Sequence, residues 1–192
     1  MATDAERCRG EDVVVVGGGN SAGQAAVNLS RAARSVRIVI RGEGLAATMS
    51  SYLVERIESR PNIEIVTRTE LSAVQGDGRL EHADLRGRDD GNVERVAVSA
   101  VFVMIGADPC TEAVDTMLDL DEAGYIRCGD GAAECEGPHR WPSTDRRPHL
   151  LETVWPGVFA AGDVRAGATK RVAGAVGDGA LAVRFAHQVL QA

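Results

Sequence analysis

The stretch from Asp12 to Ala26 constrains the fold of this chain more than any other part of the sequence. It opens with four consecutive valines, Val13–Val16, and a short apolar run of this kind is typical of a buried parallel strand. Gly17, Gly19 and Ala22 follow with the spacing G-x-G-x-x-A. In that pattern the first glycine permits a sharp turn, the second lets the backbone approach a pyrophosphate, and the small third residue lets helix and strand pack closely. The stretch therefore predicts the strand, turn and helix that begin a dinucleotide-binding unit.

The residues after the glycine-rich turn support this interpretation. Gln24–Ala33 contains good helix formers, and Val36–Ile40 has the apolar character of a second strand. Asn20 or Ser21 is expected to cap the helix, whose N-terminal amides and positive dipole end attract phosphate groups. The alternative is a turn that binds no ligand, but the strands on both sides of the turn and helix favour a binding site.

Arg41 stands where the second strand ends, and in a dinucleotide-binding unit this position faces the adenosine ribose. An acidic residue there would accept hydrogen bonds from the free ribose hydroxyls of NAD, whereas an arginine offers a cationic fork to a ribose phosphate. The sequence thus predicts a preference for NADPH over NADH. The alternative is a solvated arginine at a strand end.

The composition agrees with an α/β protein and excludes several classes of partner. Of the 192 residues 44% are hydrophobic, and 22 glycines with only 4% aromatic residues favour tight backbone turns. The net charge of −7 opposes non-specific binding to nucleic acid. No apolar run is long enough to cross a bilayer, and the start of the chain is polar, with Asp4, Glu6 and Arg7 in place of a hydrophobic signal segment. We therefore expect a cytoplasmic protein that binds neither nucleic acid nor a membrane.

The four cysteines, Cys8, Cys110, Cys128 and Cys135, contain no C-x-x-C pair and no paired metal-ligand spacing. We expect free thiols and no metal site.

Turn signals alternate with apolar runs after the second strand, which predicts a helix, a strand, an antiparallel meander and a last strand of the central sheet. The chain is then broken at Gly106–Pro109, and we place a boundary near Asp108. In order, the expected elements are a helix from Ser50 or Ser51 to Ile57, a strand at Ile63–Val66, meander strands at Leu71–Val74, Leu80–Leu85 and Val93–Val98, and the returning strand Val101–Ile105.

The second half of the chain begins with weaker patterns. We expect a short helix at Glu112–Leu118 and a brief strand at Gly124–Ile126. From Gly129 to His149 the sequence is rich in Gly, Pro, Asp and Arg without an apolar period, which predicts a surface loop, ordered or disordered. A ligand site is the alternative for this loop, but isolated loop residues rarely form one; those considered are His139, Trp141 and His149.

A second group of motifs follows this loop. Val158–Ala161 is expected to be a buried strand, with Gly162 and the carboxylate of Asp163 at its C-terminal end, where ligands bind in open α/β sheets. The last helix is expected to begin near Lys170–Ala173, and its N-terminus can stabilise negative charge on a phosphate or a flavin ring. Its apolar stripe contains Val172, Val176, Val183 and Val189.

Together these motifs resemble those of the pyridine nucleotide-disulfide oxidoreductase family, and most closely the thioredoxin reductase type of flavoprotein. Val14–Ala22 resembles the NADPH motif of the family, Phe102–Gly106 its crossover out of the NADPH domain, and Thr153–Asp163 its second FAD motif. Lys170–Ala173 and Gly177–Gly179 resemble the segment that runs beside the isoalloxazine ring.

The resemblance implies an NAD(P)H-binding domain at 11–107 and the C-terminal part of an FAD domain at 108–192. It implies hydride transfer from NADPH to FAD and then to a disulfide or other acceptor, with a thioredoxin-like protein as one such partner. Asp163 would hydrogen-bond the ribitol of FAD, and the amides near Val172, after Lys170 and Arg171, would face the flavin. Gly106 and Gly162 belong to the same cofactor motifs.

The sequence also departs from the family pattern. Gly42 and Ala46 stand where further arginines are usual, and the family's first FAD half and its C-x-x-C would precede Met1 or lie at the first residues. We therefore expect no catalytic residue in this chain and incomplete activity. The alternatives are a fragment, a subunit completed in trans by an FAD half-domain, a homodimer that covers the exposed half-domain, and a non-catalytic module that senses redox state by binding NADPH.

Overall fold

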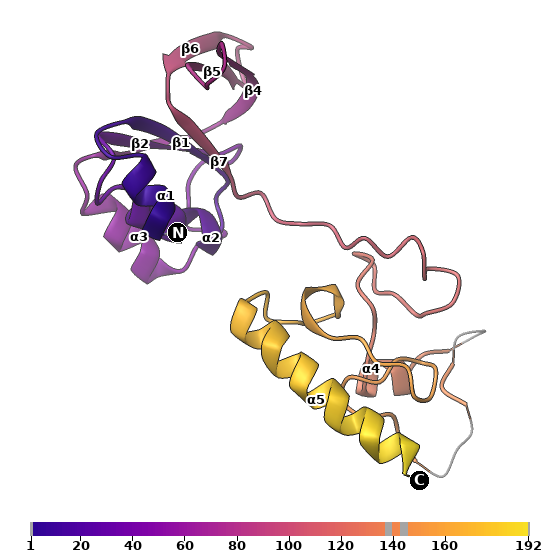
Figure 1. The fold of residues 1–192 in the computed structure, drawn as a ribbon. Helices are drawn as coiled ribbons and strands as arrows, with labels where there is room; N and C mark the ends of the chain where they lie inside the picture. Colours follow the sequence, from indigo (N-terminus) through magenta and orange to yellow (C-terminus); the bar gives the residue numbers. More distant parts are fainter. Residues whose placement is uncertain (1, 137–139, 143–145, 192) are drawn as a thin grey trace. The chain divides into compact units, whose positions relative to one another are not determined.

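The computed structural model describes residues 2–136, 140–142 and 146–191. The chain divides into two compact units, Met1–Gly106 and Ala107–Ala192 (Figure 1). Each unit is built differently.

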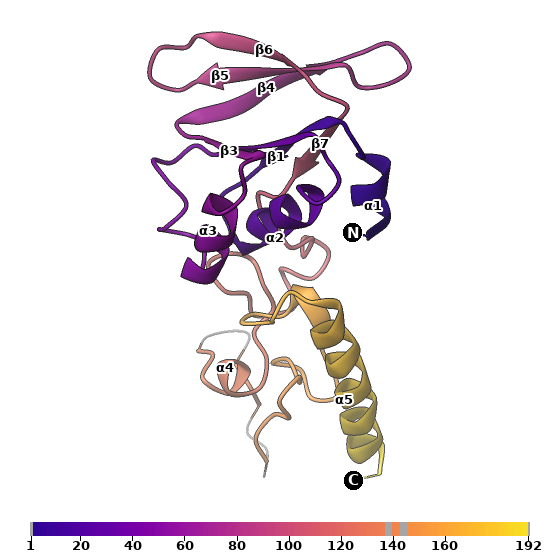
Figure 2. The same ribbon diagram turned by 90° about the vertical axis from the view of Figure 1, so that its left-hand side faces the viewer.

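The first unit contains a parallel sheet with the strand order β3-β2-β1-β7. Its strands are β1 (Asp12–Val16), β2 (Ser35–Val39), β3 (Ile63–Val66) and β7 (Ala100–Val103). Helices α1 (Ala2–Arg7), α2 (Asn20–Leu29) and α3 (Ser51–Glu58) lie on one face of this sheet, and a three-stranded antiparallel sheet lies on the other (Figure 2). That second sheet has the order β4-β5-β6 and consists of β4 (Thr69–Gln75), β5 (His82–Gly87) and β6 (Val93–Ala97).

Burial on both faces explains why the parallel strands are continuous apolar runs. Val13 and Val15 of β1 belong to the core under the helices, whereas Val14 belongs to the core under the antiparallel sheet. All three valines are almost fully buried, as expected for a parallel strand covered on both sides. The antiparallel meander is confirmed, as is the return of the chain through β7 to pair with β1.

The second unit has less regular structure than the sequence predicted. Its elements are α4 (Asp130–Ala133), a 3-10 turn η1 (Gly162–Val164) and α5 (Val172–Leu190). The helix expected at Glu112–Leu118 is wrong, because this segment forms successive turns, two of which are closed by Val114 N–H donating to Thr111 O (2.9 Å) and Met117 N–H donating to Val114 O (3.0 Å).

The two strands predicted in the second unit, Gly124–Ile126 and Val158–Ala161, are also wrong. Their residues form only isolated bridges, of which one joins Ile126 to Arg165 and another joins Glu152 to Phe159. A β-ladder needs a partner strand paired over several residues. In the described part of this unit these segments pair only through single bridges.

The Gly129–His149 segment contains the short helix α4, so it is not purely a loop as predicted. His139 lies outside the described residues. The α5 helix starts where the sequence predicted, yet none of its described residues is buried. Val172 and Leu190 are each 83% exposed. Among the described residues, no helix has the length and apolar character that crossing a membrane requires.

Candidate functional site

The first glycine of the motif is required by a close approach of two backbones. Gly17 has a φ of +131°, and a Cβ atom there would lie 2.3 Å from the carbonyl oxygen of Met104. The Gly17 amide donates to Val39 O (3.0 Å), and the Met104 amide donates to Val16 O (2.7 Å). Gly17 therefore sits where the chain leaves β1 between the ends of its two neighbouring strands.

The second glycine has open space around it. A Cβ atom at Gly19 would meet no heavy atom within 4 Å, whereas Ala22 on the inner face of α2 is fully buried. Gly19 itself is the N-cap of α2, and no side chain caps this helix. The helix thus presents its N-terminal amides beside an open turn, which is the arrangement that binds phosphate groups.

The predicted capping role of Asn20 or Ser21 is wrong, because both residues already lie within α2. The Asn20 side chain instead accepts a hydrogen bond from the Ser50 amide (2.8 Å). Thr48 Oγ1 donates to Gly18 O (2.8 Å) in the same region. The segment between β2 and α3 therefore packs along the glycine turn and fixes its position.

Arg41 is exposed and lies two residues after Val39, the last residue of β2. Arg88, which follows β5, donates from Nη1 to the carbonyl oxygen of Arg41 (3.3 Å). Sequence reasoning did not single out Arg88, because it lies 47 residues away and only tertiary pairing brings it to the end of β2. The candidate nucleotide site therefore has a second cation beside the predicted one.

The second candidate site surrounds Asp163, which is exposed in η1. Gly162 has a φ of +80°, and its amide donates to Oδ2 of Asp178 on α5 (3.1 Å). Arg165 forms an ion pair with the same carboxylate at 3.1 Å. Asp178 and Arg165, which the sequence interpretation did not assign, thus hold the Gly162–Asp163 turn against the N-terminal half of α5.

Lys170, Arg171 and Val172 are exposed at the start of α5. Arg171 is the N-cap, with extended backbone and no side-chain cap. The Lys170 ammonium lies 3.9 Å from the centre of the Tyr125 ring, within the range of a cation–π contact. The Tyr125 hydroxyl donates to Ala107 O (2.7 Å). This helix start is therefore open to a ligand and carries positive charge.

Two of the loop residues considered as a ligand site, Trp141 and His149, take part in structural contacts. The Arg146 guanidinium lies 5.2 Å from the centre of the Trp141 ring, and His149 stacks on Phe185 with 4.8 Å between ring centres. Arg146 also pairs with Glu152, which is fully buried. Burial raises the pKa of Glu152, but hydrogen bonds from Arg146 and from backbone amides outweigh burial, so that the net pKa is lowered.

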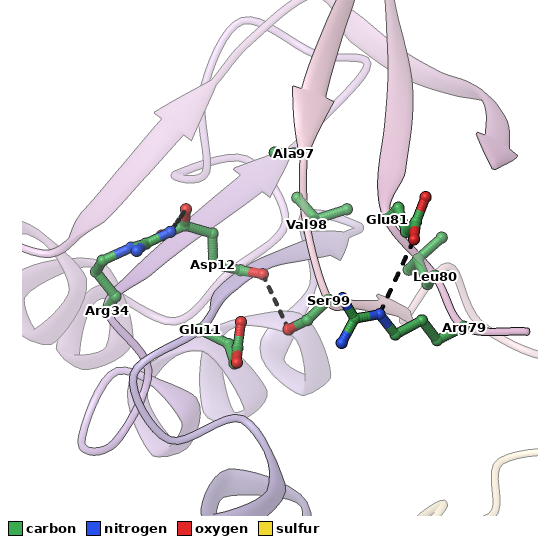
Figure 3. Close-up of a pocket in the computed structure, with 9 residues that line it drawn as sticks. All are labelled: Glu11, Asp12, Arg34, Arg79, Leu80, Glu81, Ala97, Val98 and Ser99. Carbon is green, nitrogen blue, oxygen red and sulfur yellow. Dashed lines mark hydrogen bonds and ion pairs between the residues drawn. The ribbon is translucent and has the colours of Figure 1, made fainter. Parts of the chain in front are cut away.

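A separate cavity of about 430 Å³ opens at the amino end of β1 (Figure 3). Its charged lining includes Asp12 and Arg34, and hydrogen bonding from Arg34 lowers the pKa of Asp12 to about 2. Arg79 also lines it, 4.0 Å from Glu81. Because ligands of open parallel sheets bind at the carboxyl ends of the strands, this cavity is not the candidate nucleotide site, which lies at the opposite end of β1.

The described cysteines are free, and Cys8 is buried. Burial raises the pKa of the Cys128 thiol to about 11. High thiol pKa values oppose formation of the reactive thiolate. Among the residues that the structure describes, no cluster of His, Cys, Asp and Glu is arranged to hold a metal ion.

Comparison with known proteins supports the family resemblance. The chain is 35% identical over 156 residues to a thioredoxin reductase of Mycolicibacterium smegmatis, covering 81% of this chain and 44% of that protein. It is 36% identical over 182 residues to a thioredoxin reductase of Streptomyces coelicolor, covering 95% of this chain and 50% of that protein. The chain thus spans about half the length of these relatives.

A solved thioredoxin reductase structure from Lactococcus lactis matches 99% of this chain and 56% of that chain, with a TM-score of 0.73 and 28% identity. This likeness confirms the predicted α/β fold class. The pyridine nucleotide-disulphide oxidoreductase family profile matches residues 2–179, which include both candidate cofactor sites. The chain therefore belongs to the pyridine nucleotide-disulphide oxidoreductase family.

Proposed function

We propose that the Met1–Gly106 unit binds NADPH, that the Ala107–Ala192 unit supplies part of an FAD site, and that the chain serves a thioredoxin reductase-type oxidoreductase. In that reaction NADPH supplies a hydride, and FAD takes it up for delivery to a disulfide of a thioredoxin-like protein or to another acceptor. The residues of this chain hold and orient the cofactors, which carry out the chemistry. The names of the similar proteins support the proposal.

The observation that carries the NADPH assignment is the open turn before α2. The space beside Gly19 and the uncapped helix N-terminus fit a pyrophosphate. Gly17 and Ala22 permit the tight packing that brings these amides together, while Asn20 and Ser21 form the first turn of the helix. Gly106, with a φ of +98°, allows the chain to turn away after β7.

The FAD assignment is supported by a carboxylate held beside an open helix start. In the described structure the Asp163 side chain is exposed, while Asp178 and Arg165 fix the turn that carries it. An exposed carboxylate of this kind can accept hydrogen bonds from the hydroxyl groups of ribitol. The amides at Val172 and the positive charge of Lys170 and Arg171 suit the electron-rich edge of a flavin.

The exposed apolar residues of α5 indicate that this helix packs against further protein. Burying apolar surface contributes roughly 25 cal/mol per Å², so an uncovered row of valines favours association. We propose that the other half of an FAD domain covers this face. The residues concerned are Val172, Val176, Val183 and Leu190, which are 60% to 83% exposed.

Two measurements on the 192-residue chain test the function. Calorimetric titration is expected to give saturable binding of one NADPH per chain, and the visible spectrum of the purified chain is expected to be colourless. Addition of the part of the Streptomyces coelicolor relative that this chain does not match should then bring in flavin absorbance, and Asp163→Ala should prevent it. Absence of NADPH binding would refute the assignment of the first unit.

The flavin experiment also separates the proposal from its rivals. If NADPH binds but flavin never does, with or without the added polypeptide, the chain is better described as a redox-sensing NADPH module. If the chain alone purifies with FAD in equal amount, a second copy of the chain completes the site, and sedimentation should then show a dimer. Either result would contradict the pairing of α5 with an FAD half-domain.

A further inference from the structure

We propose that Arg88 is the second cation of the ribose-phosphate site, and that Arg41 and Arg88 together select NADPH over NADH. The proposal rests on the NADPH-binding function proposed above and adds a specificity residue to it. It also gives Arg68 a positioning role, because Arg68 binds two carboxylates that would otherwise compete with the phosphate for Arg41 and Arg88.

Three backbone hydrogen bonds bring the turn after β5 to the end of β2. Thr69 N–H donates to Ile40 O (2.9 Å), and Arg68 N–H donates to Gly42 O (3.0 Å). Arg88 N–H donates in turn to Arg68 O (2.8 Å). These bonds form a continuous series from the residues around Arg41 to Arg88. The position of Arg88 is therefore set by the fold and does not depend on side-chain reach alone.

The side chain of Arg88 continues this series. Its Nη1 donates to the carbonyl oxygen of Arg41 (3.3 Å), so its guanidinium is anchored beside the residue predicted to read the ribose. Arginine has five N–H donors, and this bond uses one of them. Its other donors are available for the bidentate contacts that guanidinium groups make with phosphate.

Both guanidinium groups keep their charge available for an anion. Within the described residues, neither Arg41 nor Arg88 forms an ion pair, and both are exposed. An unpaired cation attracts phosphate without first giving up a carboxylate partner. The Arg88 guanidinium lies beside the Arg41 backbone, and two cations on neighbouring segments attract a doubly charged ribose phosphate better than one.

Arg68 explains why nearby acidic residues do not cancel this charge. Glu43, in the loop after Arg41, pairs with Arg68 Nη2 at 2.6 Å, and Asp89, next to Arg88, pairs with Arg68 Nη1 at 2.9 Å. Hydrogen bonding to Asp89 and then the charges of both carboxylates raise the pKa of Arg68. Arg68 therefore holds the two carboxylates that adjoin the cations.

The backbone of Arg68 is unusual in a way that matches this role. Arg68 has a φ of +50°, and in the described structure every other residue with positive φ is a glycine. A side-chain-bearing residue in the left-handed region costs about 1 kcal/mol or more, and such residues gather at functional sites. Glycine would relieve this strain at position 68 but would leave Glu43 and Asp89 unpaired.

In this arrangement Arg88 supplies the positive charge that further arginines in the loop after β2 would supply. Gly42 has no side chain and Ala46 has no charge, so this loop supplies Arg41 alone. Arg88 approaches from the antiparallel sheet and supplies the second positive charge from outside the loop. The cationic site is thus built from two segments of the unit in place of one.

The test compares two probes that differ only in the ribose phosphate, adenosine 2′,5′-bisphosphate and adenosine 5′-monophosphate, titrated into the 192-residue chain. Because a hydrogen bond to a charged group is commonly worth a factor of about ten or more in affinity, Arg88→Ala should weaken the bisphosphate about tenfold and leave the monophosphate unchanged. Arg88→Lys should recover part of the loss, since it restores the charge without the fork. Arg68→Ala should also weaken the bisphosphate selectively.

The matched control is Arg79→Ala, which removes another exposed arginine from the turn at the opposite end of β5. Circular dichroism confirms that each variant is folded, and Arg88→Gln replaces Arg88→Ala if the latter is not. An equal effect of Arg79→Ala and Arg88→Ala, or an equal loss for both probes, would overturn the role of Arg88 while leaving the nucleotide site intact. Failure of the unaltered chain to bind either probe would instead overturn the proposed function.

Discussion

Two glycines of one turn provide a matched test of fold against binding, because the space around them differs. A Cβ atom at Gly17 would lie 2.3 Å from Met104 O, and its φ of +131° is one that residues with side chains rarely adopt. At Gly19 a Cβ atom would meet no heavy atom within 4 Å, and the backbone is extended, with φ −88° and ψ 177°. We expect Gly17→Ala to destabilise the first unit, and Gly19→Ala to leave it folded but with weaker binding of a pyrophosphate.

The cost of Gly17→Ala has two parts. A side chain in a sparsely populated backbone region costs about 1–3 kcal/mol, and forcing extra volume into packed structure costs about 1–3 kcal/mol more. We expect the free energy of unfolding to fall by about 2 kcal/mol or more, which lowers the melting temperature of a unit of this size by roughly 8 °C or more. For Gly19→Ala, a gain of about 0.4–1 kcal/mol from the unfolded state is offset by a poorer N-cap of similar size.

Thermal unfolding followed by far-ultraviolet circular dichroism measures the first effect, and hydrogen exchange at Asp12–Val16 assigns it to the first unit. Calorimetric titration with NADPH measures the second, for which we expect a loss of about tenfold or more in Gly19→Ala, equivalent to about 1.4 kcal/mol. If Gly17→Ala has the same melting temperature as the parent chain, the close approach of Gly17 to Met104 is wrong. If Gly19→Ala binds NADPH as tightly as the parent, the pyrophosphate does not lie on this turn.

Three further outcomes are expected. Arg41→Ala should remove much of the preference for NADPH over NADH, by about tenfold in the ratio of affinities; equal affinities in the unaltered chain would contradict the role of Arg41. The chain alone should not reduce thioredoxin with NADPH, because it contains no C-x-x-C; turnover that Cys8→Ser abolishes would show that Cys8 is a redox residue. Arg34 lowers the pKa of Asp12 from 3.8 to about 2, so the stability that this carboxylate contributes is present above pH ~4 and is lost as the pH falls towards ~2; acid titration of Asp12→Asn should lack this loss, and identical acid profiles would count against the pair.

The first unit could be predicted closely because its signals are local. The valines of β1, the glycine spacing before α2 and the turn signals around the meander each specify an element within a few residues of themselves. Strand β3 has the predicted limits, Ile63–Val66, and Leu53 and Ile57 are buried on one face of α3 as their spacing indicated. A fold can be predicted from sequence where such local signals agree with one another.

The second unit could not be predicted as well, because its apolar segments lack partners along their length. Val158–Ala161 has the composition of a strand, yet it pairs through one bridge at Phe159. Composition specifies the tendency of a segment to pair, whereas the ladder itself depends on which residues lie beside it. The Asn20 cap was wrong because α2 begins one residue earlier than expected, with Gly19 as its N-cap; the Asn20 side-chain oxygen accepts instead from the Ser50 amide, thirty positions away.

Arg88 could not be predicted for the same reason: local sequence does not show which distant residues lie beside the candidate site. A motif search confined to the loop after β2 finds Arg41, Gly42 and Ala46 and scores a weakened phosphate site. The pairing of Thr69 with Ile40 places the start of β4 beside that loop and carries the β5 turn, and with it Arg88, to the same strand end. Phosphate responds to the total charge within a few ångströms, whichever segment supplies it. Preference for NADPH in chains of this architecture is therefore better judged from all the cations around the carboxyl end of β2, together with the carboxylates that neutralise them, than from one loop.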